Sequence, residues 1–228
     1  PGTDSTLASN FDISDLDKRV ENKARLQSEL GLPVNPSIPL LAMITRMDPQ
    51  KGVDIAVEGF RQVVDREWQV VILGTGVHHL ETAVRSLQDE EPERVRAEIR
   101  YDAKLSRQIY AGADLLLMPS RYEPCGLAQL IAMRYGCVPL GRATGGLVDT
   151  IRSFTDAESG TGFLFDEATP YAFANCLREA LLVFSDKERW VRLQHNGMSQ
   201  DFSWENAARK YSDLYQKLLT HKDADKFG

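Results

Sequence analysis

The sequence predicts an α/β fold, in which a doubly wound, open sheet of parallel strands is covered by helices on both faces. Continuous apolar runs at residues 40–44, 70–73 and 115–118 are typical of parallel strands that are buried on both sides. Segments with a helical spacing of apolar residues alternate with these runs. Because alternating strands and helices favour parallel strands joined by right-handed crossovers, the pattern indicates one such sheet.

The first half of the chain alternates most regularly. Residues 1–11 are polar and rich in turn formers, so we expect a loop or linker there. A broken apolar stripe predicts a helix over residues 15–30, which Gly31, Pro33 and Pro36 bring to an end. The same criteria then predict strand 40–44, helix 53–64, strand 69–73, helix 77–89, a weaker strand 95–100, helix 105–110 and strand 115–118.

The second half adds two strands and several helices. Pro124 presets a backbone angle suited to the start of a helix, and the apolar residues Leu127 and Leu130 fit a helix packed on the sheet. Thr169 and Pro170 supply the cap residue and the first-turn proline that open another helix. We expect strand 137–140, helix 147–154, a polar loop at 156–162, an edge strand at 162–165, helices at 169–184 and 186–198, a last amphipathic helix ending near residue 219 and a fraying tail at 221–228.

Composition excludes several classes of function. The 228 residues, 43% of them hydrophobic, are enough for one large globular domain or for one domain with an extension. A formal net charge of −6 argues against a broad nucleic-acid-binding face, and no apolar run approaches the ~20 residues that span a bilayer. The sequence has no zinc or calcium ligand pattern, so we expect no bound metal and no cofactor apart from the substrate.

The cysteines indicate the redox environment. Cys125, Cys137 and Cys176 form no CxxC pair, and their odd number and wide spacing favour a reducing compartment over a disulfide framework. No signal peptide is visible, and because the first residue is Pro1 we expect the sequence to begin inside a longer protein.

Residues suited to a phosphorylated ligand follow five of the predicted strands. In doubly wound sheets, ligands bind beyond the carboxyl ends of the strands. Those ends carry two cations, two glycine pairs, an aromatic ring and a carboxylate, namely Arg46, Lys51, Gly74, Gly76, Tyr101, Glu123, Gly145 and Gly146. Predicted helix starts near residues 124 and 146 would add free N–H groups, which hold anions such as phosphates. This convergence predicts a site for a phosphorylated polar ligand at one edge of the sheet.

Each of these residues also has a structural interpretation. Arg46 and Lys51 could be a solvated surface pair, and Glu123 could be an ordinary loop carboxylate beside a helix start. Tyr101 could pack at the rim on the short helix that follows it, and the second glycine pair could form a turn that binds nothing. Cys125 could be a small buried residue, which is the commoner role of a free cysteine.

Four blocks of sequence resemble the signatures of bacterial glycogen synthases and plant starch synthases. They are RMDPQKG at 46–52, LGTG at 73–76, PSRYEPCGL at 119–127 and TGGL at 144–147, and their order and spacing match that family. The sequence FSW at 202–204, followed by the last helix, is similar to the family's C-terminal end. The resemblance covers nearly the whole chain, and its block at 119–127 is highly specific.

The resemblance implies that the chain is the donor-binding, C-terminal half of a two-domain GT-B glycosyltransferase. Such enzymes transfer glucose from ADP-glucose to the non-reducing end of an α-1,4-glucan and retain the anomeric configuration. We therefore expect a linker and helix at 1–35, a Rossmann-like nucleotide-sugar-binding domain at 36–200, a helix at 201–220 that packs toward the N-terminal domain and a frayed tail at 221–228. The expected partners are a nucleotide sugar, an α-glucan acceptor and that N-terminal domain, in the bacterial cytoplasm or the plastid stroma.

The resemblance also assigns roles to single residues. Arg46 and Lys51 match the family's diphosphate-binding pair, and Glu123 matches the carboxylate that holds the transferred glucose; we expect these three to be catalytic. Tyr101 would stack on the adenine. Related retaining enzymes carry a second Glu eight positions after the first, where this chain has Ile131. The remaining contacts to the nucleoside, sugar and diphosphate would come from Gly74, Gly76, Cys125, Gly126, Leu127, Thr144, Gly145 and Gly146.

Two other functions fit the same residues. The first is a retaining GT-B enzyme that uses a UDP-sugar, which competition between ADP-glucose and UDP-glucose would separate from the main interpretation. The second is a non-catalytic nucleotide-sugar sensor that keeps the cleft but carries out no transfer.

Overall fold

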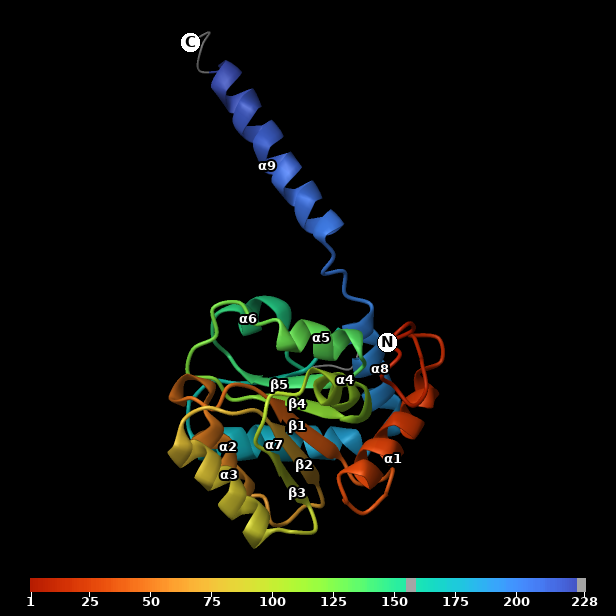
Figure 1. The fold of residues 1–228 in the computed structure, drawn as a ribbon. Coiled ribbons are helices and arrows are strands. Elements are labelled where there is room, and N and C mark those ends of the chain that lie inside the picture. Colours follow the sequence, from red (N-terminus) through yellow and green to blue (C-terminus); the bar gives the residue numbers. More distant parts are fainter. Residues whose placement is uncertain (155–158, 225–228) are drawn as a thin grey trace.

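A single sheet of parallel strands forms the centre of the molecule. The computed structural model describes residues 1–154 and 159–224. Six strands run in the order β3-β2-β1-β4-β5-β6, and every neighbouring pair is parallel (Figure 1). The strands are β1 (Leu40–Ile44), β2 (Gln69–Leu73), β3 (Val95–Glu98), β4 (Leu115–Met118), β5 (Val138–Arg142) and β6 (Phe163–Phe165). The predicted doubly wound α/β fold is confirmed, with β6 at the edge as expected.

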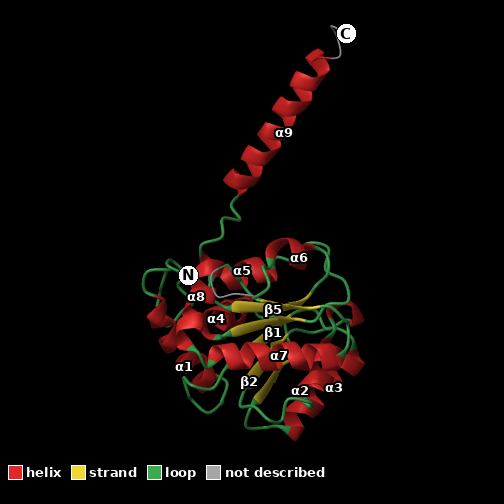
Figure 2. Cartoon of the chain, turned by 180° about the vertical axis from the view of Figure 1, so that it is seen from behind, coloured by secondary structure: helices red, strands yellow, loops and turns green. Residues whose placement is uncertain are grey.

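Helices cover both faces of the sheet (Figure 2). One face packs against α2 (Val53–Phe60), α3 (His78–Glu90), α7 (Pro170–Phe184) and part of α8 (Lys187–Met198). The other face packs against α1 (Arg19–Glu29), α4 (Ala103–Gly112), α5 (Ala128–Arg134) and α6 (Gly146–Thr150). Alternate strand residues therefore serve opposite cores: Leu41 and Met43 belong to the first, whereas Leu40 and Ala42 belong to the second.

The strand order places the ligand crevice. The chain adds β2 and β3 on one side of β1 and then crosses to add β4, β5 and β6 on the other side. The crossovers on the two sides of this switch point diverge, so that the carboxyl ends of β1 and β4 border an open crevice. Both of those ends lead into loops that the sequence analysis singled out.

Several helices differ from their predicted bounds, and the helix predicted at 53–64 ends at Phe60. The helix expected to start near Pro124 begins at Ala128, because Gly126 has a φ of +71° and the chain cannot be helical through it. The backbone of residues 123–127 is therefore a loop. The helix expected at 147–154 ends at Thr150, and Ile151 is extended.

The N-terminal segment is a loop, as predicted, but it packs on the body of the molecule. Leu7 and Phe11 are buried with Leu16 of the 3-10 helix Leu16–Lys18 and with Met198. The predicted helix at 15–30 is thus this 3-10 turn followed by α1.

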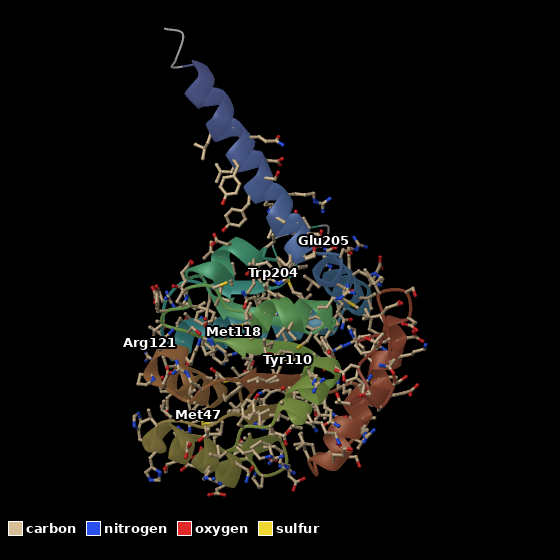
Figure 3. All side chains as sticks on the ribbon, turned by 45° about the horizontal axis from the view of Figure 1, so that its top comes forward. Met47, Tyr110, Met118, Arg121, Trp204 and Glu205 are labelled. Carbon is tan, nitrogen blue, oxygen red and sulfur yellow. The ribbon has the colours of Figure 1, made fainter. Side chains whose placement is uncertain are left out.

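The last helix leaves the body. α9 (Trp204–Ala224) projects away from the sheet and its covering helices (Figure 1), and Trp204, in its first turn, is 89% exposed (Figure 3). It continues past residue 219, where its end was predicted, and into the predicted tail at 221–228 as far as Ala224. Residues 225–228 of that tail, and residues 156–158 of the predicted polar loop, lie outside the described residues.

A buried ion pair joins α1 to the amino edge of the sheet. Lys23 Nζ lies 2.7 Å from Asp114 Oδ2, and both side chains are less than a tenth exposed. We expect Lys23→Met to lower the free energy of unfolding by about 3–5 kcal/mol, because the carboxylate of Asp114 would stay buried without its cation. Urea unfolding measures the loss.

The matched control is Lys18→Met, which removes an exposed pair with Asp15. It should cost at most about 1 kcal/mol. The account of the buried pair is wrong if the two variants lose the same stability.

Candidate functional site

Two adjoining cavities open at the carboxyl edge of the sheet. Both are lined by Ile44 and Thr45, at the end of β1, so they are neighbours. The larger has a volume of about 270 Å³ and is also lined by Arg46, Leu73, Gly74, Thr75, Arg100, Tyr101, Asp102 and Ser106. The smaller, of about 90 Å³, is also lined by Met43, Lys51, Leu117, Met118, Ser120, Glu123, Gly126, Leu127 and Ala128.

An ion pair joins two loops in the smaller cavity. Lys51 Nζ lies 2.6 Å from Glu123 Oε2, with the two side chains 19% and 7% exposed. The hydroxyl of Ser120 also donates to Glu123 Oε2, over 3.3 Å. The backbone presents Lys51 at the end of the short 3-10 helix Pro49–Lys51, which Asp48 caps. The carboxylate of Glu123 is therefore buried and held by two donors.

The loop that carries Glu123 is fastened from two sides. Arg142, at the end of β5, donates through Nε to the carbonyl of Ser120 over 2.7 Å, and through Nη2 to the carbonyl of Arg121. Arg121 in turn donates two hydrogen bonds, of 2.7 and 2.8 Å, to the carboxylate of Asp54 in α2. These bonds hold the pKa of the Asp54 carboxyl below its usual value. The loop is thus rigidly placed relative to the loop of Lys51.

The second glycine pair lies directly against this loop. Gly146 N donates to the carbonyl of Glu123 over 3.0 Å. A Cβ at Gly145 would overlap the carbonyl oxygen of Glu123, and one at Gly146 would overlap that of Cys125. Gly145 also has a φ of +46°, which favours glycine. Glycine is therefore needed here for backbone contact.

The larger cavity has an aromatic and a cationic rim. Tyr101 is 87% exposed, and the side chain of Arg46 is 74% exposed, with its Nη2 lying 3.0 Å from Asp48 Oδ2. Arg100 pairs with Glu98 and, over 3.3 Å, with Asp102. The exposed Tyr101 ring is not packed on α4, so one structural interpretation of this residue is excluded.

The structure brings most of the predicted site residues to one edge. Four of them, Lys51, Glu123, Gly126 and Leu127, line the smaller cavity, and Arg46, Gly74 and Tyr101 line the larger. Gly76 packs its backbone on Met47 beside the loop of Arg46, and Gly145 and Gly146 contact the Glu123 loop. Cys125 is exposed and, like Thr144, lines neither cavity.

Three residues that hold or line the candidate site were not predicted from the sequence. Ser120 and Arg142 hold Glu123 and its loop, and Arg100 lines the larger cavity. Arg142 follows the predicted strand 137–140, and Arg100 ends the predicted strand 95–100, so the rule that located the other residues could have found both. Ser120 lies inside the most specific of the four sequence blocks.

Within the described residues, no group of three or more metal-binding side chains comes together. In the same part of the chain, no helix has both the length and the hydrophobicity that crossing a membrane needs.

Comparison with known proteins identifies relatives of this chain. Residues 38–182 match the family described as glycosyl transferases group 1. Glycogen synthases from Thermotoga petrophila and Anaeromyxobacter dehalogenans are 43% and 45% identical to the chain, over 222 and 218 residues. These alignments cover 96% of the chain and 46% of each relative, so the chain spans about half the length of these relatives.

Two solved structures have folds similar to that of this chain. The catalytic domain of starch synthase IV from Arabidopsis thaliana, bound to ADP and acarbose, superposes with a TM-score of 0.87 at 37% identity, over 96% of this chain and 46% of that one. A sucrose-phosphate synthase from Thermosynechococcus elongatus, at 24% identity and a TM-score of 0.64, covers 87% of this chain and 49% of that one and shows the shared fold alone.

The three thiols should differ in reactivity. Burial raises the pKa of Cys137 and of Cys176 to about 12, so both stay protonated at pH 8, whereas Cys125 is exposed. We expect an alkylating reagent at pH 8 to modify Cys125 alone in the folded chain, and all three cysteines in urea. Peptide mass spectrometry identifies the modified residues, and fast labelling of Cys137 in the folded chain would contradict the core described above.

Proposed function

We propose that this chain, which belongs to the group 1 family of glycosyl transferases, is the donor-binding half of a glycogen or starch synthase. It would bind ADP-glucose, and the complete enzyme would transfer the glucose to the non-reducing end of an α-1,4-glucan. The observation that carries the proposal is the Lys51–Glu123 pair, set in a small cavity beside a larger one with an aromatic rim.

The two cations suit the departure of a nucleoside diphosphate. When the bond from the anomeric carbon to the diphosphate breaks, negative charge builds on the phosphate oxygens. Lys51 and Arg46 border adjoining cavities, so a diphosphate lying across them would meet both cations. Fixed cations stabilise that charge more in the transition state than in the ground state, which lowers the barrier.

Glu123 suits the sugar that is left behind. Its carboxylate is buried and lies in the smaller cavity, where it can accept hydrogen bonds from sugar hydroxyls. It would also stabilise positive charge at the anomeric carbon as the diphosphate departs. Lys51 forms an ion pair with this carboxylate, so a bound diphosphate would share the lysine with Glu123.

The larger cavity suits the nucleoside. A ring stacked on Tyr101 would cover a side chain that is otherwise 87% exposed. At Gly74 a Cβ would overlap the carbonyl of Thr45, so glycine lets β1 and β2 end close together below the base. The Arabidopsis starch synthase IV structure holds ADP, which supports an adenine nucleotide here. Of the remaining predicted contacts, Gly76 would lie close to the nucleoside, and Cys125, Thr144, Gly145 and Gly146 would contact the sugar and diphosphate.

The last helix suits contact with the N-terminal domain of a two-domain enzyme. Its exposed large hydrophobic residues recur at helical spacing and form one face, namely Trp204, Tyr211, Leu214, Tyr215 and Leu218. A face of this kind is normally covered by another part of the protein. Closure of two domains over the donor would exclude water, so the chain alone should bind nucleotide weakly and extend no glucan.

Titration calorimetry of this chain tests the donor. We expect binding of ADP and ADP-glucose in preference to UDP, and loss of about tenfold or more in affinity for ADP in Lys51→Ala, because a phosphate contact to a charged group is removed. Tighter binding of UDP than of ADP would favour a UDP-sugar enzyme instead.

The exposed thiol reports on the same site. Because Cys125 contacts Gly146 through its carbonyl, a nucleotide sugar bound there should shield its side chain, and saturating ADP-glucose should slow its alkylation. Equal labelling with and without ADP-glucose, under conditions where calorimetry shows saturation, would place the donor elsewhere.

Turnover separates an enzyme from a sensor. In a longer protein that carries this chain and its N-terminal domain, Arg46→Ala and Lys51→Ala should reduce kcat by about a hundredfold while binding of ADP-glucose is partly kept, because the cations act most strongly on the leaving group. A protein in which the wild type turns nothing over and both variants lose binding would be a sensor. Arg178→Ala, which removes an exposed pair with Asp65, is the control and should leave kcat unchanged.

A further inference from the structure

The buried amide of Gln129 connects the loop of residues 123–127 to α6, which begins at the second glycine pair. Gln129, in the first turn of α5, has no exposed surface. Its Nε2 donates to the carbonyl of Cys125 over 3.0 Å and to the carbonyl of Gly126 over 2.9 Å. A third contact, of 3.1 Å, reaches the hydroxyl of Thr150 at the end of α6. One amide group thus holds the loop of residues 123–127 and α6 together.

The hydrogen bonds that start at Gln129 continue through Thr150 to Gly146 of the second glycine pair. The hydroxyl of Thr150 donates to the carbonyl of Gly146 over 2.6 Å, so its oxygen accepts from Gln129 and its hydrogen is used on α6. Together with the bond from Gly146 N to the carbonyl of Glu123, this closes a ring of hydrogen bonds around the junction of the two loops. Such a ring fixes spacing more firmly than any single bond, because each bond limits the motion that would break the others.

The orientation of the amide is set by its surroundings. Three acceptors face its nitrogen, whereas its Oε1 is buried and has no donor among the described residues. Turning the amide over would point Oε1 at two carbonyl oxygens. The three acceptors around the nitrogen therefore determine which way the amide points.

We propose that Gln129 is a positioning residue of the nucleotide-sugar site: its amide clamps the sugar-side loop, 123–127, to the diphosphate-side turn, 145–146, at a fixed spacing. The inference rests on the proposed function. Gln129 lines neither cavity, so it touches no ligand and acts through the backbone of the two loops.

The loop of residues 123–127 lies close enough to Gln129 for the amide to bond its carbonyls. Gly126 has a φ of +71°, and a Cβ there would collide with the Gln129 amide, so the loop folds tightly over this side chain. A loop in this conformation has few bonds of its own, since α5 begins only at Ala128. The amide supplies bonds to its carbonyls that a helical turn would otherwise make.

The test compares two buried glutamines in this chain. Gln129→Met keeps the length of the side chain and removes the donor; Gln194→Met does the same at Gln194, whose amide donates to the carbonyl of Gly136 at the amino end of β5. Both variants should lose thermal stability. Calorimetry should show ADP affinity falling about tenfold or more only in Gln129→Met, because a small displacement of site groups has a large effect on binding.

Thr150 provides a second, milder pair of variants. Thr150→Val removes the hydroxyl that continues the ring and should weaken ADP binding, whereas Thr150→Ser keeps it and should bind as the wild type does. A purely structural role for the side chains would change the melting temperature without separating Val from Ser in affinity. Equal affinities in all four variants and the wild type would overturn the clamp.

Amide hydrogen exchange gives a readout that needs no ligand. In Gln129→Met, peptides covering residues 123–127 and 145–147 should exchange faster than in the wild type, and in Gln194→Met they should not. Unchanged exchange in both segments would overturn the clamp even if binding were weaker. If the wild type bound no ADP, the proposed function would fall, and exchange alone would decide whether the two loops are clamped.

Discussion

The ion pair between Lys51 and Glu123 is the interaction on which the site depends. It joins the loop after β1 to the loop after β4, which lie side by side only because the sheet order puts those strands next to each other. Burying a carboxylate is unfavourable unless a cation and further hydrogen bonds accompany it, and here Lys51 and the hydroxyl of Ser120 provide both. Both charges are needed for the proposed chemistry, and each lowers the free-energy cost of burying the other.

Close backbone contact is the second condition. Around Glu123, the chain packs carbonyl against glycine at 145 and 146, and below the larger cavity it does so at 74 and 76. Side chains at these positions would hold the loops apart, and the cavities would no longer adjoin. Two arginines then hold the loops in this close arrangement, since Arg142 and Arg121 connect the Glu123 loop to β5 and α2. The glycines of the four sequence blocks thus allow both the close packing of the loops and the shape of the proposed ligand site.

Much of this could be predicted from the sequence, and the reasons for the rest are physical. Buried parallel strands are continuous apolar runs, so the strands and the edge that carries the site were predictable. The helix predicted at Pro124 was not correct, because a positive φ at Gly126 outweighs the helical preference of a proline two residues earlier. The pairing of Lys51 with Glu123, 72 residues apart, depends on tertiary packing that no local pattern records. The same is true of Gln129, whose partners lie in two different loops.

The central claim is that the loops at the carboxyl edge form one site for a nucleoside diphosphate and its sugar. Chemical-shift mapping of the isotopically labelled 25.6 kDa chain during titration with ADP tests it most directly. The account predicts that the amide signals of Gly74, Gly126 and Gly146 shift together with one dissociation constant. It also predicts that those of Gly31 and Gly136, away from that edge, stay in place. Shifts at Gly31 and Gly136, with the first three glycines unmoved, would contradict it.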